Sequence, residues 1–126
     1  MNEIKNIIDE LGIAALESNI KIAGVAVVSD SGKIIQQTSN WDLTHQTQII
    51  QNVIKGDNSF VINGTKFSII NSTEEGIIGT NENGMGHILI MPFQGGVLVS
   101  YAMPQADLSQ ALSFLKVYAM KMDEML

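Results

Sequence analysis

Few side chains in this sequence could carry acid–base or nucleophilic chemistry. There are two histidines, His45 at the start of a polar helix and His87 in a strand. We assign both a structural role, because serine and aspartate are too common for a catalytic triad to be recognised from spacing, and no G-x-S-x-G segment occurs. Neighbouring acidic residues do not face each other on a helix, so Asp9-Glu10 and Asp123-Glu124 indicate solvated surface, and Glu74-Glu75 is expected in a turn. These features predict a binding protein and not an enzyme.

Metal and cofactor sites also lack their usual signatures. The chain has no cysteine, which excludes disulfides, zinc fingers and iron–sulfur clusters. No H-x-x-x-H or EF-hand spacing occurs. The glycine-rich segments Gly84-Met85-Gly86 and Gly95-Gly96 match neither a phosphate-binding loop nor a dinucleotide-binding fingerprint, so they indicate tight turns. We therefore expect no cofactor and no metal.

The charge balance narrows the classes of partner. The 126 residues carry a formal net charge of −6, and all seven basic residues are lysines. Without a cationic face or the bidentate forks of arginine, the sequence argues against binding nucleic acid or phosphate. No apolar run is long enough for a membrane span and the start shows no signal peptide, so we expect a cytoplasmic protein. The length and the absence of a linker predict one domain, residues 1–126.

Hydrophobic periodicity predicts the secondary structure. Apolar residues recur on one face of the first helix at Ile4, Ile7, Ile8 and Leu11, and Asn63-Gly64 is a strong hairpin signal. We expect helices at 4–19, 42–55 and 107–122, the second capped by Asp42 or Thr44. We expect strands at 20–28, 33–38, 59–62, 65–70, 76–80, 86–91 and 97–102. Short connections favour an antiparallel sheet, so the fold class is α+β with terminal helices packed on the sheet.

The order of these elements resembles that of the profilins over almost the whole chain. The most specific match is the segment FVINGTKFSII, residues 60–70, which is similar to a profilin segment with phenylalanine, valine, glycine, lysine and an apolar strand. The resemblance implies a profilin-like fold: a central antiparallel sheet, the N- and C-terminal helices on one face, and a further helix between strands. The composition, rich in isoleucine and asparagine with lysine as the basic residue, suggests a divergent, archaeal member.

Profilins are cytoplasmic proteins that bind actin monomers and regulate filament assembly, so the resemblance implies this function here. It also implies an actin-binding face built from one edge of the sheet and the start of the last helix. The residues of that face are Phe60, Val61, Lys66, Ser68, Ile70, Asn71, Thr80, Glu82, Gln105, Ala106, Leu108 and Lys116. We expect the protein to act as a monomer at the cytoskeleton.

The sequence departs from the family pattern in ways that bear on its partners. Profilins usually carry basic residues where Asn71, Thr80 and Glu82 stand, and actin surfaces are acidic, so we expect weaker binding or a different choice of actin. The aromatic groove for proline-rich peptides is incomplete, because Ile35 stands where a tryptophan is usual and Tyr118 is alone. We therefore expect weak or absent polyproline binding. The acidic chain also argues against phosphoinositides.

Two other classes of protein remain open. A roadblock or longin-type scaffold for small GTPases has a similar order of elements but places a long helix between its second and third strands. The helix expected at 42–55 is compatible with either layout. A PAS-type sensor would enclose a ligand pocket with its strands, and no convergent polar set marks such a pocket. Both terminal helices on one face of the sheet would distinguish the profilin layout.

Overall fold

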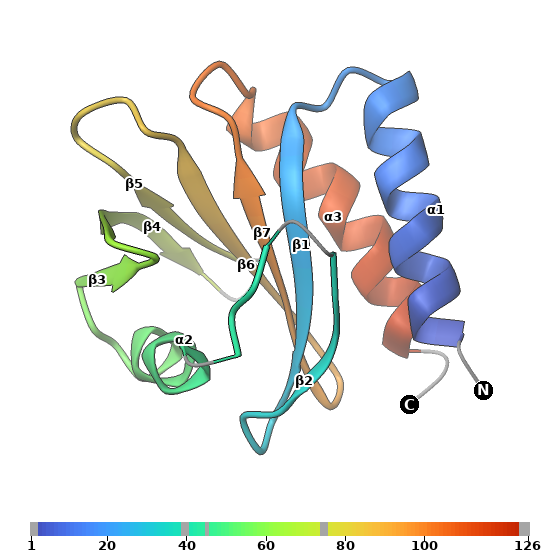
Figure 1. Ribbon diagram of the computed structural model, residues 1–126, viewed down its shortest axis with the longest axis horizontal. Helices are drawn as coiled ribbons and strands as arrows, with labels where there is room; N and C mark the ends of the chain where they lie inside the picture. The colour runs from blue at the N-terminus through green and yellow to red at the C-terminus, as the bar shows by residue number, and fades with distance from the viewer. Residues whose placement is uncertain (1–2, 39–40, 45, 74–75, 124–126) are drawn as a thin grey trace.

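The computed structural model describes residues 3–38, 41–44, 46–73 and 76–123 (Figure 1). The helices are α1 (Glu3–Glu17), α2 (Thr47–Ile54) and α3 (Leu108–Asp123). The strands are β1 (Ile22–Ser29), β2 (Ile34–Gln37), β3 (Ser59–Ile62), β4 (Thr65–Thr73), β5 (Gly76–Thr80), β6 (His87–Phe93) and β7 (Gly96–Ala102). This order confirms the predicted succession of elements. His45, the pair Glu74-Glu75 and Glu124 lie outside the described residues.

The strands form one antiparallel sheet in the order β2-β1-β7-β6-β5-β4-β3. The hairpin β1–β2 pairs through β1 with β7, the last strand, so the N-terminal part of the chain closes on the C-terminal part. α1 and α3 lie side by side on one face of the sheet, and α2 lies on the other (Figure 1). The structure therefore confirms the predicted α+β fold, with both terminal helices on one face and a further helix between strands.

The face under α1 and α3 holds the larger layer of the core. Leu11 of α1 and Leu115 of α3 are fully buried there, with alternate side chains of the central strands. At the surface of this layer, Lys121 Nζ donates a 2.8 Å hydrogen bond to Glu10 Oε1 and lies 4.7 Å from the centroid of the Tyr118 ring. The bond to Glu10 raises the pKa of the Lys121 ammonium, because it favours the charged form. The contact ties α1 to α3.

The face under α2 holds a second apolar layer. Ile50 and Val53 of α2 pack with Phe60 of β3 and Phe67 of β4. The two phenylalanine rings stack with their centroids 5.5 Å apart. A Cβ at Gly79 would lie 2.9 Å from the Phe60 ring, so glycine at this position lets the ring pack directly against β5.

The start of α2 differs from the prediction. Asp42 Oδ1 accepts a 2.9 Å hydrogen bond from the Thr44 N–H, which closes a local turn around the buried Leu43. The N-cap of α2 is Gln46, whose side chain makes no capping bond. Gln46 instead accepts a 2.7 Å hydrogen bond from the Asn63 N–H. The prediction that Asp42 or Thr44 caps this helix is therefore wrong.

The hairpin between β3 and β4 confirms the Asn-Gly signal. Asn63 and Gly64 have φ values of 50° and 83°, the two positive values of a type I′ turn. β4 then continues beyond the predicted end at residue 70, because Asn71 and Thr73 pair with β5 although both are exposed. Exposed polar residues carry little strand signal, which explains the shorter prediction.

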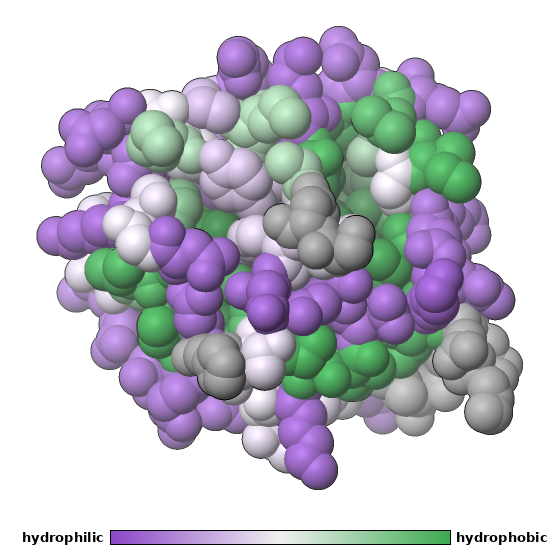
Figure 2. Space-filling model, in the orientation of Figure 1, coloured by the Kyte–Doolittle hydropathy of each residue, from purple (hydrophilic) through white to green (hydrophobic). Residues whose placement is uncertain are grey.

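Apolar side chains are exposed on the second half of α1. Ile13 is 61% exposed and Leu16 is 83% exposed. Figure 2 shows apolar atoms over this end of α1, at the upper right of the view.

Among the described residues, no helix combines the length and the apolar character needed to cross a membrane.

Candidate protein-binding surface

The helix α3 covers the centre of its face of the sheet and leaves β4 open to solvent. It contacts β6 and β7, whereas Lys66 and Asn71 of β4 are exposed. Asn71 pairs with Ile78 of β5, a member of the core layer under α1 and α3. Because paired residues point to the same side of a sheet, and side chains alternate along a strand, Lys66, Ser68 and Asn71 belong to this face.

A row of paired residues joins β4 to the segment before α3. Ser68 pairs with Thr80, and Thr80 pairs with His87. Thr80 Oγ1 lies 2.9 Å from His87 Nδ1, and His87 Nε2 lies 3.4 Å from the carbonyl oxygen of Pro104. Residues predicted in the sheet and residues predicted near α3 therefore belong to one continuous region.

The turn between β5 and β6 holds Glu82 beside Lys66. Asn81 Nδ2 donates a 2.7 Å hydrogen bond to the Lys66 carbonyl oxygen, and Asn81 Oδ1 accepts from the N–H groups of Asn83 and Met85. Lys66, Ser68, Glu82 and the two asparagines line a small polar hollow of about 80 Å³. The positive and negative charges at its rim suit recognition of a mixed polar surface.

The start of α3 completes the region. Asp107 Oδ1 accepts a 3.1 Å hydrogen bond from the Gln110 N–H, which confirms Asp107 as the N-cap. Gln105 is exposed before this cap, and Leu108 is half-buried against the core. Lys116 lies two turns beyond Leu108 on the same side of the helix and is exposed.

Most of the predicted site residues come together on this face. We call it the β4–α3 surface and define it by Val61, Lys66, Ser68, Asn71, Thr80, Glu82, Gln105, Ala106, Leu108 and Lys116. Ile70 lies beside it, 60% exposed, where the register of β4 against β5 shifts between Ile69 and Asn71.

Phe60 does not belong to this surface. Only 6% of it is exposed, and its ring packs on the α2 side of the sheet against Phe67. Val61, the next residue, is 48% exposed and pairs with Lys66. Neighbouring residues of a strand point to opposite faces, so Phe60 and Val61 cannot both contact one partner. Phe60 supports the strand from behind.

His87 lies between Thr80 and the segment before α3, and the sequence prediction did not include it. We add it to the β4–α3 surface. It is half-buried, and its side chain bonds to β5 and to the segment before α3. The available signal is the alternation along β6, where Leu89 and Met91 face the core under α3. His87, at the same parity, must point to the same side. The described residues contain no group of histidine, aspartate and glutamate that could hold a metal ion.

Comparison with known proteins now places the chain. No family model matches it. Loki profilin-1 of Lokiarchaeum sp. is 34% identical over an alignment 135 residues long, and the alignment covers 98% of this chain and 98% of the relative. The chain belongs to the profilin family. A second profilin of that organism, Loki profilin-2, is 33% identical over 131 residues, which cover 95% of each chain.

Solved profilin structures resemble the chain either in both sequence and fold or in fold alone. The structure of Loki profilin-1 matches with a TM-score of 0.87 and 32% identity, covering 100% of this profilin and 99% of the other. The complex of Loki profilin-2 with rabbit actin gives the same TM-score, identity and coverages. Profilin IB of Acanthamoeba castellanii matches with a TM-score of 0.72 and 11% identity, covering 86% and 90%. The amoebal match shows the shared fold alone.

Proposed function

We propose that this profilin binds actin monomers and regulates filament assembly through the β4–α3 surface. The observation that carries the proposal is its likeness, over the whole chain, to two profilins whose structures have been solved with rabbit actin. Loki profilin-2 in its complex is 32% identical to this chain, and so is Loki profilin-1 in its own complex. Both cover 100% of this chain.

The physical character of the surface supports a protein partner. Val61 is 48% exposed and pairs with Lys66 of the polar hollow, and Ile70 is 60% exposed further along β4. Apolar contact area bordered by polar and charged groups is the usual composition of a protein interface. The row Ser68–Thr80–His87 is fixed by strand pairing, so binding costs little ordering of the backbone.

The same fold supports several coarser expectations. We propose that the protein acts as one domain and as a monomer in the cytoplasm, by binding alone and without a cofactor. A GTPase scaffold of the roadblock type is not favoured, because both terminal helices lie on one face of the sheet. Weak or absent binding of proline-rich peptides stays a prediction. The only tryptophan, Trp41, packs on the α2 side, away from the terminal helices.

Polymerisation of rabbit actin with a pyrene reporter tests the proposal. We expect the protein to slow spontaneous assembly in a concentration-dependent way, and Lys66→Glu to weaken this effect at least tenfold, because it reverses the charge of an exposed lysine within the surface. Lys33→Glu is the matched control. It makes the same charge change at an exposed position of the β1–β2 hairpin, at the other end of the sheet.

The possible results test actin binding separately from the location of the binding surface. Equal loss in both lysine variants would indicate a net-charge effect and contradict the assignment of Lys66. No effect of the unmodified protein on rabbit actin or on the actin of its own source would contradict actin binding itself.

A further inference from the structure

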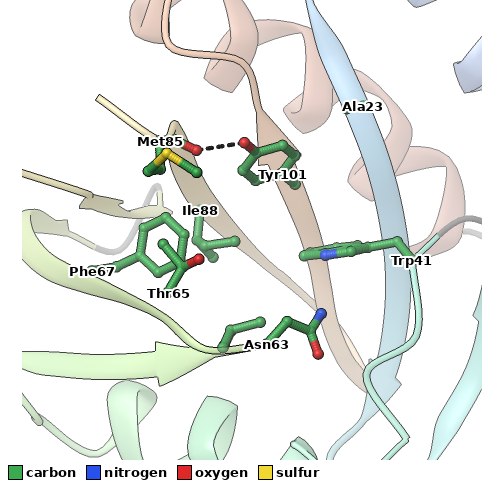
Figure 3. A pocket seen from close by; sticks show the side chains of 9 residues that line it. Ala23, Trp41, Asn63, Thr65, Phe67, Met85, Ile88 and Tyr101 are labelled. Carbon is green, nitrogen blue, oxygen red and sulfur yellow. Dashed lines mark hydrogen bonds between the residues drawn. The ribbon is translucent and has the colours of Figure 1, made fainter. Parts of the chain in front are cut away.

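A groove on the α2 side of the sheet plays no part in the proposed function. Its volume is about 290 Å³, and it is open to solvent on one side. Nine residues line it: Ala23, Trp41, Ile62, Asn63, Thr65, Phe67, Met85, Ile88 and Tyr101. Figure 3 shows Phe67 and Trp41 on opposite sides of the open space, with Tyr101 at one end and Asn63 at the other. The β4–α3 surface lies on the opposite face of the sheet.

The walls of the groove are built by close contacts. A Cβ at position 24 would lie 2.8 Å from Trp41, and a Cβ at position 86 would lie 2.7 Å from Tyr101. Gly24 and Gly86 therefore allow the two aromatic side chains to lie directly against the strands. Gly86 has a φ of 111°, which fixes the backbone in a conformation that other residues rarely adopt.

The two aromatic walls are also fixed relative to each other. The Trp41 and Tyr101 ring centroids lie 6.4 Å apart with the planes tilted by 39°. The Tyr101 hydroxyl donates a hydrogen bond to the Met85 carbonyl oxygen (Figure 3). Because this bond occupies the hydroxyl at the rim, Tyr101 presents its ring to the groove.

One polar group at the other end of the groove is held in a defined orientation. The side-chain Oδ1 of Asn63 accepts a hydrogen bond from Gln46 Nε2, and the backbone N–H of Asn63 donates to Gln46 Oε1 over 2.7 Å. This pairing fixes the amide, so its Nδ2 donor points toward the indole of Trp41 (Figure 3). Thr65 also lines the groove, on the side of Phe67 (Figure 3).

The chemistry of the lining selects a class of ligand. The nine lining residues include aromatic rings, a thioether and aliphatic side chains but no charged group. A charged ligand would lose its hydration without a compensating ion pair. The volume is at the lower limit of small-molecule pockets, which suits about two fused rings. Flat rings match the aromatic walls, and an acceptor on the edge of the ligand matches the Asn63 donor.

We propose that the groove between Trp41 and Tyr101 binds a small, flat, uncharged aromatic molecule that carries a hydrogen-bond acceptor on its edge. The site is separate from the β4–α3 surface, so occupation does not need actin. Trp41 is the only tryptophan of the chain and forms one wall, which makes its emission a direct reporter of the groove.

A neutral diethylaminocoumarin is a suitable probe, because it has two fused rings, a lactone carbonyl at its edge, and absorption that overlaps tryptophan emission. We expect saturable quenching of Trp41 emission below about 1 mM probe. The carboxylate derivative of the same coumarin should bind at least tenfold more weakly, because none of the nine described residues that line the groove carries a charge to pair with it. Absence of saturation, or equal binding of the carboxylate, would overturn the proposal.

Two variants locate the binding with the full-length protein. Thr65→Phe fills the groove and should weaken coumarin binding at least tenfold. Ser72→Phe makes a similar change on the exposed far end of β4 and should leave binding unchanged. Asn63→Gly keeps the left-handed turn and removes the donor, with an expected three- to tenfold loss. Binding that survives Thr65→Phe would place the probe elsewhere and contradict the assignment.

A second variant tests the groove even if Thr65→Phe does not fold. Met85 is 55% exposed at the mouth of the groove, so Met85→Glu adds a carboxylate there without filling the interior. We expect at least tenfold weaker coumarin binding and unchanged inhibition of actin assembly. Loss of the actin effect in this variant would contradict the separation of the groove from the β4–α3 surface, and unchanged coumarin binding would contradict the groove as the binding site.

Discussion

Thr80 and His87 face each other across β5 and β6, with Thr80 Oγ1 2.9 Å from His87 Nδ1. The other ring nitrogen lies 3.4 Å from the carbonyl oxygen of Pro104. A carbonyl oxygen can only accept, so Nε2 carries the proton, and in the neutral imidazole Nδ1 accepts the hydrogen of the Thr80 hydroxyl. One side chain thus couples the open strands of the β4–α3 surface to the start of α3.

The hydroxyl of Thr80 should contribute measurably to stability. Thr80→Val keeps the shape of the side chain but removes the donor to His87, and it should lower the free energy of unfolding by about 1 kcal/mol. Thr80→Ser retains the hydroxyl and serves as the matched control. Urea unfolding measures both variants. A valine variant as stable as the serine variant would show that this hydrogen bond contributes no net stability.

The sequence predicts this fold well where the signals are local. The Asn63-Gly64 turn and the order of elements follow from turn chemistry and hydrophobic period. The start of α2 could not be predicted in this way, because Asp42 accepts its hydrogen bond from Thr44 in a local turn and does not cap the helix. The turn surrounds the buried Leu43, and the packing of that side chain cannot be read from the sequence.

The candidate surface could be predicted only in part, because part of it depends on how strands pair. Strand alternation places Lys66, Ser68 and Thr80 on one side once the register is known. The alignment with the family put Phe60 on that side as well, where alternation excludes it. The groove beside Trp41 depends on contacts between segments far apart in sequence, so no local pattern predicts it.

The charge of Glu82 should limit binding to an acidic actin surface. Glu82→Lys replaces repulsion with attraction beside Lys66, and we expect a several-fold gain in actin affinity, mainly through faster association at low salt. Glu17→Lys makes the same charge change at an exposed position on α1. Stopped-flow binding at two salt concentrations measures the effect. An equal gain in both variants would assign it to net charge.

Gly86 and Gly84 allow steric crowding to be separated from backbone strain. Both have positive φ, 111° and 76°, so alanine is strained at either position. Only at Gly86 would the new Cβ meet other atoms, 2.7 Å from Tyr101, whereas nothing lies within 4 Å of it at Gly84. We expect Gly84→Ala to cost about 1 kcal/mol and Gly86→Ala about 2 kcal/mol more. Thermal unfolding measures the difference, and equal losses would refute close packing of Tyr101.

Gly12 offers a substitution that should stabilise the protein. It lies within α1, and a Cβ there would meet no atom within 4 Å. Gly12→Ala therefore removes backbone freedom from the unfolded chain without crowding the folded one, and it should raise the free energy of unfolding by about 0.5–1 kcal/mol. Urea unfolding should show a higher midpoint with an unchanged slope. Gly24→Ala is the contrasting variant, because its Cβ would lie 2.8 Å from Trp41 and should destabilise the fold. A loss of stability in Gly12→Ala would mean that α1 does not continue as a regular helix through this residue.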